Sequence, residues 1–78
     1  MHRIYFDTNN EVDDGYNLSS VGSLRDIAPI ADQLRDGLHV ILYMTGELEL
    51  EAILKFDSQT GRWIGFPVPG TLRYIDGT

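Results

Sequence analysis

Residues 38–56 read LHVILYMTGELELEAILKF, and this stretch decides the fold. Leu38–Met44 is almost continuously apolar, Thr45-Gly46 is a turn signal, and Glu47–Phe56 alternates polar and apolar residues. Two β-prone runs around a turn signal predict a hairpin, and alternation with period two predicts a strand buried on one face. The predicted core face of the second strand consists of Leu48, Leu50, Ala52, Leu54 and Phe56.

Two loop lengths fit this hairpin and give opposite registers. A three-residue loop at Thr45 to Glu47 pairs Met44 with Leu48 and turns Val40 and Leu42 towards the core. A two-residue loop inverts every side chain of the first strand, because successive strand residues point to opposite faces. With the three-residue loop, the second face carries His39, Ile41, Tyr43, Glu49, Glu51 and Ile53.

In either register an apolar stripe falls on the second face of the sheet. A strand that is apolar on both sides normally has both sides covered. The cover is the N-terminal segment, a curled barrel-like closure, or a second subunit. Because 78 residues leave little chain for a second layer, we expect a homo-oligomer, most simply a dimer.

The rest of the chain predicts a short strand, one helix and two further strands. Arg3–Phe6 is a β-prone run, whereas residues 7–22 show little periodicity. Ser23 and Asp26 resemble a capping box. Because Pro29 removes an amide from a helix interior, we expect a turn at residues 24–27, a regular helix from Ala28 or Pro29, and its end at Gly37.

Residues 62–66 and 71–75 are predicted strands, separated by Pro67-Val68-Pro69-Gly70. The predicted fold is therefore a single α+β domain over residues 1–78. It has a short N-terminal strand, one helix, and a four-stranded antiparallel meander, open or curled like a barrel, packed on the helix.

Composition excludes several classes of function. The formal net charge is −6, with six basic and twelve acidic residues and no basic cluster, so nucleic acid is not an expected partner. The sequence has no cysteine, which excludes a disulfide, a thiolate zinc site and a cysteine nucleophile. No run approaches the roughly 18 apolar residues of a membrane span, so we expect a cytoplasmic protein without membrane contact. Basic proteins, cationic molecules and metal ions remain electrostatically permitted partners.

Residues 7–15 contain oxygen ligands at alternate positions, as calcium loops do. The candidate ligands are Asp7, Asn9, Glu11 and Asp13. However, Val12 stands where such a loop has glycine, and Leu18 stands where it has glutamate. We therefore expect a solvated acidic loop with a turn at Asp13-Asp14-Gly15, and no cofactor.

Catalysis has no positive support in the sequence. His2 and His39 have no partner nearby in sequence that marks a general base, and no serine lies in a nucleophile-elbow motif. No glycine-rich phosphate loop is present. The pattern favours a protein that is not an enzyme.

Glu47, Glu49 and Glu51 form an acidic row that has three interpretations. The pattern favours a solvated strand face. The alternatives, in order, are a surface for a basic partner or cationic ligand, and a set of buried glutamates paired with Arg62, Arg73 or His39 across an interface. The predicted function is a small acidic, non-enzymatic interaction module that associates with itself and engages a basic protein. The alternative is a small-molecule or cation-binding protein, or an enzyme, with a polar site near Glu49 and Glu51. The candidate interaction surface is His39, Ile41, Tyr43, Glu49, Glu51 and Ile53.

Overall fold

The computed structural model describes residues 1–75. One α-helix, two 3₁₀ turns and seven strands are present in this range. In chain order they are β1 (Arg3–Tyr5), η1 (Thr8–Asn10), β2 (Glu11–Val12), β3 (Gly15–Asn17), α1 (Val21–Ile27), η2 (Ala28–Gln33), β4 (His39–Met44), β5 (Leu48–Asp57), β6 (Arg62–Pro67) and β7 (Arg73–Tyr74).

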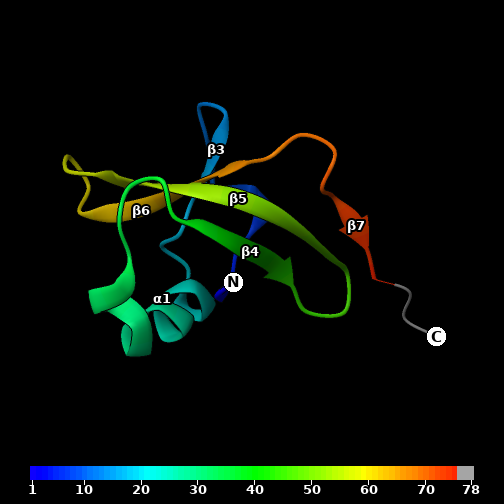
Figure 1. Ribbon diagram of the computed structural model, residues 1–78, viewed down its shortest axis with the longest axis horizontal. Coiled ribbons are helices and arrows are strands. Elements are labelled where there is room, and N and C mark those ends of the chain that lie inside the picture. The colour runs from blue at the N-terminus through cyan, green and yellow to red at the C-terminus, as the bar shows by residue number, and fades with distance from the viewer. Residues whose placement is uncertain (76–78) are drawn as a thin grey trace.

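The strands form one mixed sheet with the order β1-β4-β5-β6-β3-β2, and β7 pairs with β5 off this path. The α+β class is confirmed, but the antiparallel four-stranded meander is wrong. β1 runs parallel to β4, because the long connection between them provides the crossover that a parallel pair needs. The last strand returns to β5 beside the β4–β5 turn instead of adding to β6 (Figure 1). Residues 11–17 also add β2 and β3, which the sequence pattern did not predict.

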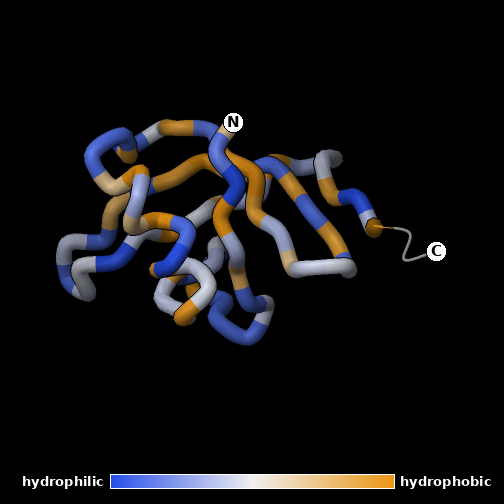
Figure 2. Tube along the Cα trace, turned by 90° about the horizontal axis from the view of Figure 1, so that it is seen from below, coloured by the Kyte–Doolittle hydropathy of each residue, from blue (hydrophilic) through white to orange (hydrophobic). Residues whose placement is uncertain are grey.

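The β4–β5 hairpin has the register that the three-residue loop predicts. Met44 lies opposite Leu48, Leu42 opposite Leu50, and Val40 opposite Ala52. Gly46 takes a φ of 72° in the turn, a left-handed conformation that glycine adopts without steric cost. Polar and apolar segments alternate along the chain as it leaves this turn (Figure 2).

The helical region differs from the prediction. The regular α-helix lies before Pro29, over Val21–Ile27, and the segment that contains Pro29 is the 3₁₀ turn η2. Ser20, not Ser23, is the N-cap, and its hydroxyl accepts the backbone N–H of Ser23. Pro29 lies at the start of η2, where its missing N–H leaves no bond unmade. The regular helix therefore comes first and the turn second, which is the reverse of the predicted order.

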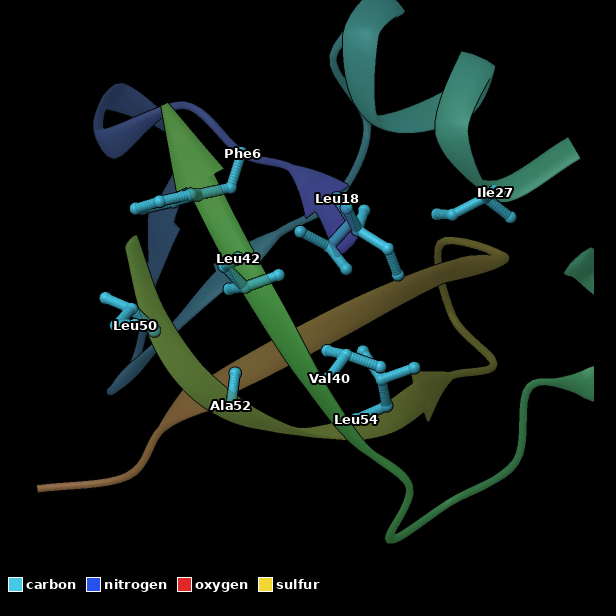
Figure 3. Packing of buried hydrophobic residues seen from close by; sticks show 9 residues of the cluster. Phe6, Leu18, Ile27, Val40, Leu42, Leu50, Ala52 and Leu54 are labelled. Carbon is cyan, nitrogen blue, oxygen red and sulfur yellow. The ribbon is translucent and has the colours of Figure 1, made fainter. Parts of the chain in front are cut away.

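The core lies on the inner side of the curved sheet, between β1, β4 and β5 (Figure 3). Phe6 and Tyr16 meet edge to face with ring centroids 4.9 Å apart, which joins the two ends of the sheet across the core. Gly65 faces this core, and a Cβ there would lie 2.8 Å from Cδ1 of Leu42, so glycine permits the close approach. The sheet remains open: it is not the closed barrel that was one of the predicted forms. Its buried apolar residues are Ile4, Phe6, Leu18, Ile27, Val40, Leu42, Leu50, Ala52 and Leu54.

Helix α1 packs along β1 and covers its free edge. The Tyr5 N–H donates to Oδ2 of Asp26 at 2.9 Å, and the buried Ser23 hydroxyl donates to the Tyr5 carbonyl oxygen. The two side chains thus occupy the hydrogen-bonding positions of a further strand. This arrangement also ends the sheet on that side, which explains why β1 does not continue into a barrel.

Candidate interaction surface

The face of the sheet opposite the core is called the outer face here. Strand alternation places on it all six residues of the predicted interaction surface. His39, Ile41 and Tyr43 of β4 lie opposite Ile53, Glu51 and Glu49 of β5, respectively. Alternation along the neighbouring strands adds Arg3, Lys55, Asp57, Arg62, Ile64, Phe66 and Arg73.

The centre of the outer face is apolar. Ile53 is 37% exposed and lies opposite the half-buried Phe66 of β6, with the half-buried Ile41 on β4. Helix α1 contacts β1, at the side of the sheet, and no helix of residues 1–75 packs over Ile53. The predicted apolar stripe is therefore present, and the N-terminal segment does not cover it.

Glu49 forms ion pairs with two arginines of the outer face. Its side chain is only 12% exposed, and its two carboxylate oxygens accept hydrogen bonds from Arg3 of β1, at 2.7 Å, and from Arg73 of β7. Arg3 and Arg73 are far apart in sequence, but the strand pairings bring both beside Glu49. Of the three interpretations of the acidic row, the paired one describes Glu49, with Arg73 as a partner inside the chain.

The other two glutamates of the row differ from Glu49. Glu47 is exposed in the β4–β5 turn, and Glu51 is half-buried on the outer face. The Glu51 N–H donates to the Thr71 hydroxyl at 3.0 Å, and the Glu51 carbonyl oxygen accepts the Val68 N–H at 2.9 Å. These two bonds fix the backbone of Glu51. A shallow groove of about 400 Å³ runs past Ile41, Glu49, Glu51, Thr71 and Arg73.

The outer face is electrically unlike the rest of the molecule. Its strand residues include four of the six basic residues of the chain and three acidic residues, a net charge of +1, whereas the whole chain has −6. The four basic residues are Arg3, Lys55, Arg62 and Arg73, and the three acidic residues are Glu49, Glu51 and Asp57. The acidic row therefore does not make this face acidic.

Tyr43 links the outer face to helix α1. Its hydroxyl donates to Oδ2 of Asp26 at 2.6 Å, and this bond, with burial, raises the pKa of the Tyr43 phenol. The guanidinium carbon of Arg3 lies 4.9 Å from the centroid of the Tyr43 ring, a cation–π contact. Tyr5 meets the same ring edge to face, at 5.9 Å between centroids. A continuous set of contacts therefore runs from Asp26 to Arg73.

The candidate calcium ligands have local structural roles. Oδ1 of Asp7 accepts the Asn9 N–H and caps η1, and Glu11 belongs to β2. Asp13 has a φ of 51° in the turn between β2 and β3, in agreement with the turn predicted at Asp13-Asp14-Gly15. Within residues 1–75, no three His, Asp or Glu residues gather as metal ligands. None of the helices in this range has the length and apolar character of a membrane span.

Comparison of the chain with protein-family models, curated proteins and solved structures finds no match. The geometry of the outer face is therefore the basis for a functional proposal. The role of Arg3 was not predictable, because nothing in the sequence shows that β1 lies parallel to β4. For Arg73, the sequence signal was the predicted strand over residues 71–75, in which residues 73 and 75 lie on one face and residue 74 lies on the other.

Proposed function

We propose that this chain is a non-enzymatic interaction module that associates with itself through the outer face. The observation that carries the proposal is the apolar centre at Ile53, Ile41 and Phe66, which no helix of residues 1–75 covers. A second copy would remove these side chains from water, and each Å² of apolar surface that it buries stabilises the complex by roughly 25 cal/mol before the cost of association.

The charges support a second copy as the partner. Two molecules of charge −6 repel one another, so they approach with least repulsion through a surface that is not acidic. The outer face, with a net charge of +1, is such a surface. In a twofold, face-to-face contact, basic side chains such as Lys55 and Arg62 of one copy meet acidic ones such as Glu51 of the other.

The other predicted partners find less support at this surface. A basic protein or a small cation that binds the acidic row has to compete with Arg3 and Arg73 for Glu49. The groove beside Glu51 is shallow and is lined by Arg73 itself. Self-association is therefore the function that this geometry favours.

Light scattering coupled to size-exclusion chromatography tests the proposal through the molar mass. Ile53→Glu places a charge in the apolar centre and is expected to halve the mass of the assembly. Ile53→Lys should do the same, because loss of the apolar contact, and not the sign of the added charge, is the cause.

Ala31→Glu is the matched control. Ala31 is exposed in η2, which packs against α1, so this variant should keep the mass of the wild type. The proposal is overturned if the wild type has the mass of one chain, or if both Ile53 variants retain the wild-type mass.

A further inference from the structure

In the part of the chain that the structure describes, three strands of the sheet have a free edge, and two of these edges are protected. At β1, the Ser23 and Asp26 side chains occupy the hydrogen-bonding positions beside Tyr5. At β2, Glu11 with the adjoining Asp13 and Asp14 makes this edge exposed and acidic. Like charges along an edge are an ordinary means of preventing strand addition.

The third edge, on β7, has backbone groups that point away from the sheet. The Ile75 N–H donates to the Glu47 carbonyl oxygen at 2.8 Å, so residues 73 and 75 face β5. In an antiparallel pair, hydrogen-bonded and non-hydrogen-bonded positions alternate. The N–H and C=O of Tyr74 therefore point outward, on the side where β7 has no neighbouring strand within residues 1–75 (Figure 1).

The side chains along this edge are apolar and exposed. Leu72 is 48% exposed, Tyr74 77% and Ile75 38%. Arg73 is the one charged residue within residues 70–75, and its guanidinium pairs with Glu49, which also pairs with Arg3. This edge thus carries a single, paired charge, whereas the edge at β2 carries three acidic side chains and repels a second copy of itself.

We propose that β7 adds to β7 of a second copy, antiparallel, so that two sheets become continuous. The occupant is a second copy, because the outward N–H and C=O of Tyr74 are complementary to the same groups of another Tyr74 and this edge has no row of like charges. This step rests on the self-association proposed above, and the two interfaces centre on different residues, Ile53 and Tyr74. In the fitting register Tyr74 lies opposite the partner's Tyr74, and their outward backbone groups exchange two hydrogen bonds. A register centred on Arg73 would set two guanidinium groups opposite each other.

Two different twofold interfaces on one chain build assemblies larger than a dimer. Wild-type protein should therefore have the mass of at least four chains. Tyr74→Pro removes the outward N–H and leaves the bonds of residues 73 and 75 to β5 in place. It should reduce the assembly to two chains, as Ile53→Glu does, and the double variant should have the mass of one chain.

The two proposals fail in different ways. If Tyr74→Pro keeps the wild-type mass, strand addition is overturned and the outer-face contact stands. If Ile53→Glu keeps the wild-type mass and Tyr74→Pro lowers it, the outer-face contact is overturned. A wild type with the mass of one chain overturns both.

Hydrogen exchange in the wild type tests the edge without a variant. The Tyr74 amide should be protected at high protein concentration and should exchange faster on dilution. If it exchanges freely at every concentration, the edge does not pair with a second copy, whatever the fate of the Tyr74→Pro variant. Tyr74→Ser, which keeps the backbone N–H, should retain part of the protection.

Discussion

Tyr43, at the end of β4, donates its hydroxyl hydrogen to Oδ2 of Asp26 in α1, with 2.6 Å between the oxygens. The same carboxylate oxygen accepts the Tyr5 N–H of the edge strand. One oxygen atom therefore connects the helix, the edge of the sheet and the outer face. The alternation of β4 turns Tyr43 away from the core, so this bond fastens α1 to the sheet independently of the core contacts of Ile27.

Tyr43→Phe should lower the free energy of unfolding by about 1–2 kcal/mol, because a hydrogen bond to a charged acceptor is lost in a half-buried place. Urea denaturation at neutral pH measures the change. Tyr74→Phe is the control: this ring is 77% exposed, and its loss of a hydroxyl should change stability by less than about 0.5 kcal/mol. Equal effects of the two variants would contradict a role for the Asp26 bond.

The same bond predicts a dependence of stability on alkaline pH. The folded-state pKa of Tyr43 is raised, chiefly because its hydroxyl donates to Asp26. This contribution to stability is therefore complete below the pKa of an unfolded tyrosine, about 10, and is lost as the pH rises through the folded-state value. Unfolding free energies measured on both sides of pH 10 should fall less steeply in Tyr43→Phe than in the wild type. Parallel curves would show that Tyr43 does not titrate in this way.

Ser23→Ala should destabilise the fold by about 1–3 kcal/mol, because the Tyr5 carbonyl oxygen loses its buried donor. Ser20→Ala, which removes the N-cap, should cost about 1 kcal/mol. Ser58→Ala, in the exposed β5–β6 turn, is the control. If Ser23→Ala behaves like the control, the Ser23 hydroxyl does not secure the edge of β1.

The β4–β5 hairpin was predictable because its signal is local. Alternation over residues 48–56 predicts the core face of β5, but the sequence left two loop lengths open for β4, and the structure has the three-residue loop. The arrangement around β1 was not predictable. Ser23 and Asp26 have the spacing of a capping box, but their partners lie on Tyr5, and only the parallel pairing of β1 with β4 brings them there.

The candidate surface was likewise predictable only where its signal is local. Alternation placed Glu49, Glu51 and Ile53 on one face of β5, and the three-residue loop that the structure has adds Ile41. The sequence pattern alone favoured solvated glutamates, whereas Glu49 is largely buried between two arginines. The burial follows from β1 and β7 lying on opposite sides of the hairpin, and that topology depends on contacts between the ends of the chain.

Glu49→Gln should reduce stability by about 1 kcal/mol, a modest figure because Arg3 and Arg73 are more than half exposed and water screens them. The difference should shrink in about 1 M salt, where the screening length is a few ångströms. Glu51→Gln, which alters no ion pair found within residues 1–75, is the matched control and should change stability by less than about 0.5 kcal/mol. If the loss of stability in Glu49→Gln does not depend on salt, its cause is a change in packing and not the loss of the ion pairs.

Asn17 in β3 carries a buried side-chain oxygen, Oδ1, that has no hydrogen-bond partner within the described residues. Such an oxygen loses its bond to water on folding and gains none in return, at a cost of about 1–3 kcal/mol. Asn17→Val removes the oxygen and places a β-branched residue in a strand opposite Ile64, where such residues pack well. It should therefore raise the free energy of unfolding by about 1 kcal/mol.

Asn17→Asp provides the opposite change at the same position, because it replaces the unpaired amide by a carboxylate of nearly the same shape. Burial of an unpaired charge is more costly than burial of an amide, so this variant should be less stable than the wild type at neutral pH. Its stability should recover towards acidic pH, where the carboxyl group is protonated in the folded state. Urea denaturation of the three proteins at two pH values tests this. At neutral pH the free energy of unfolding should decrease in the order Asn17→Val, wild type, Asn17→Asp. If Asn17→Val is the least stable of the three, the Asn17 side chain makes a favourable contact, and its oxygen is not a source of instability.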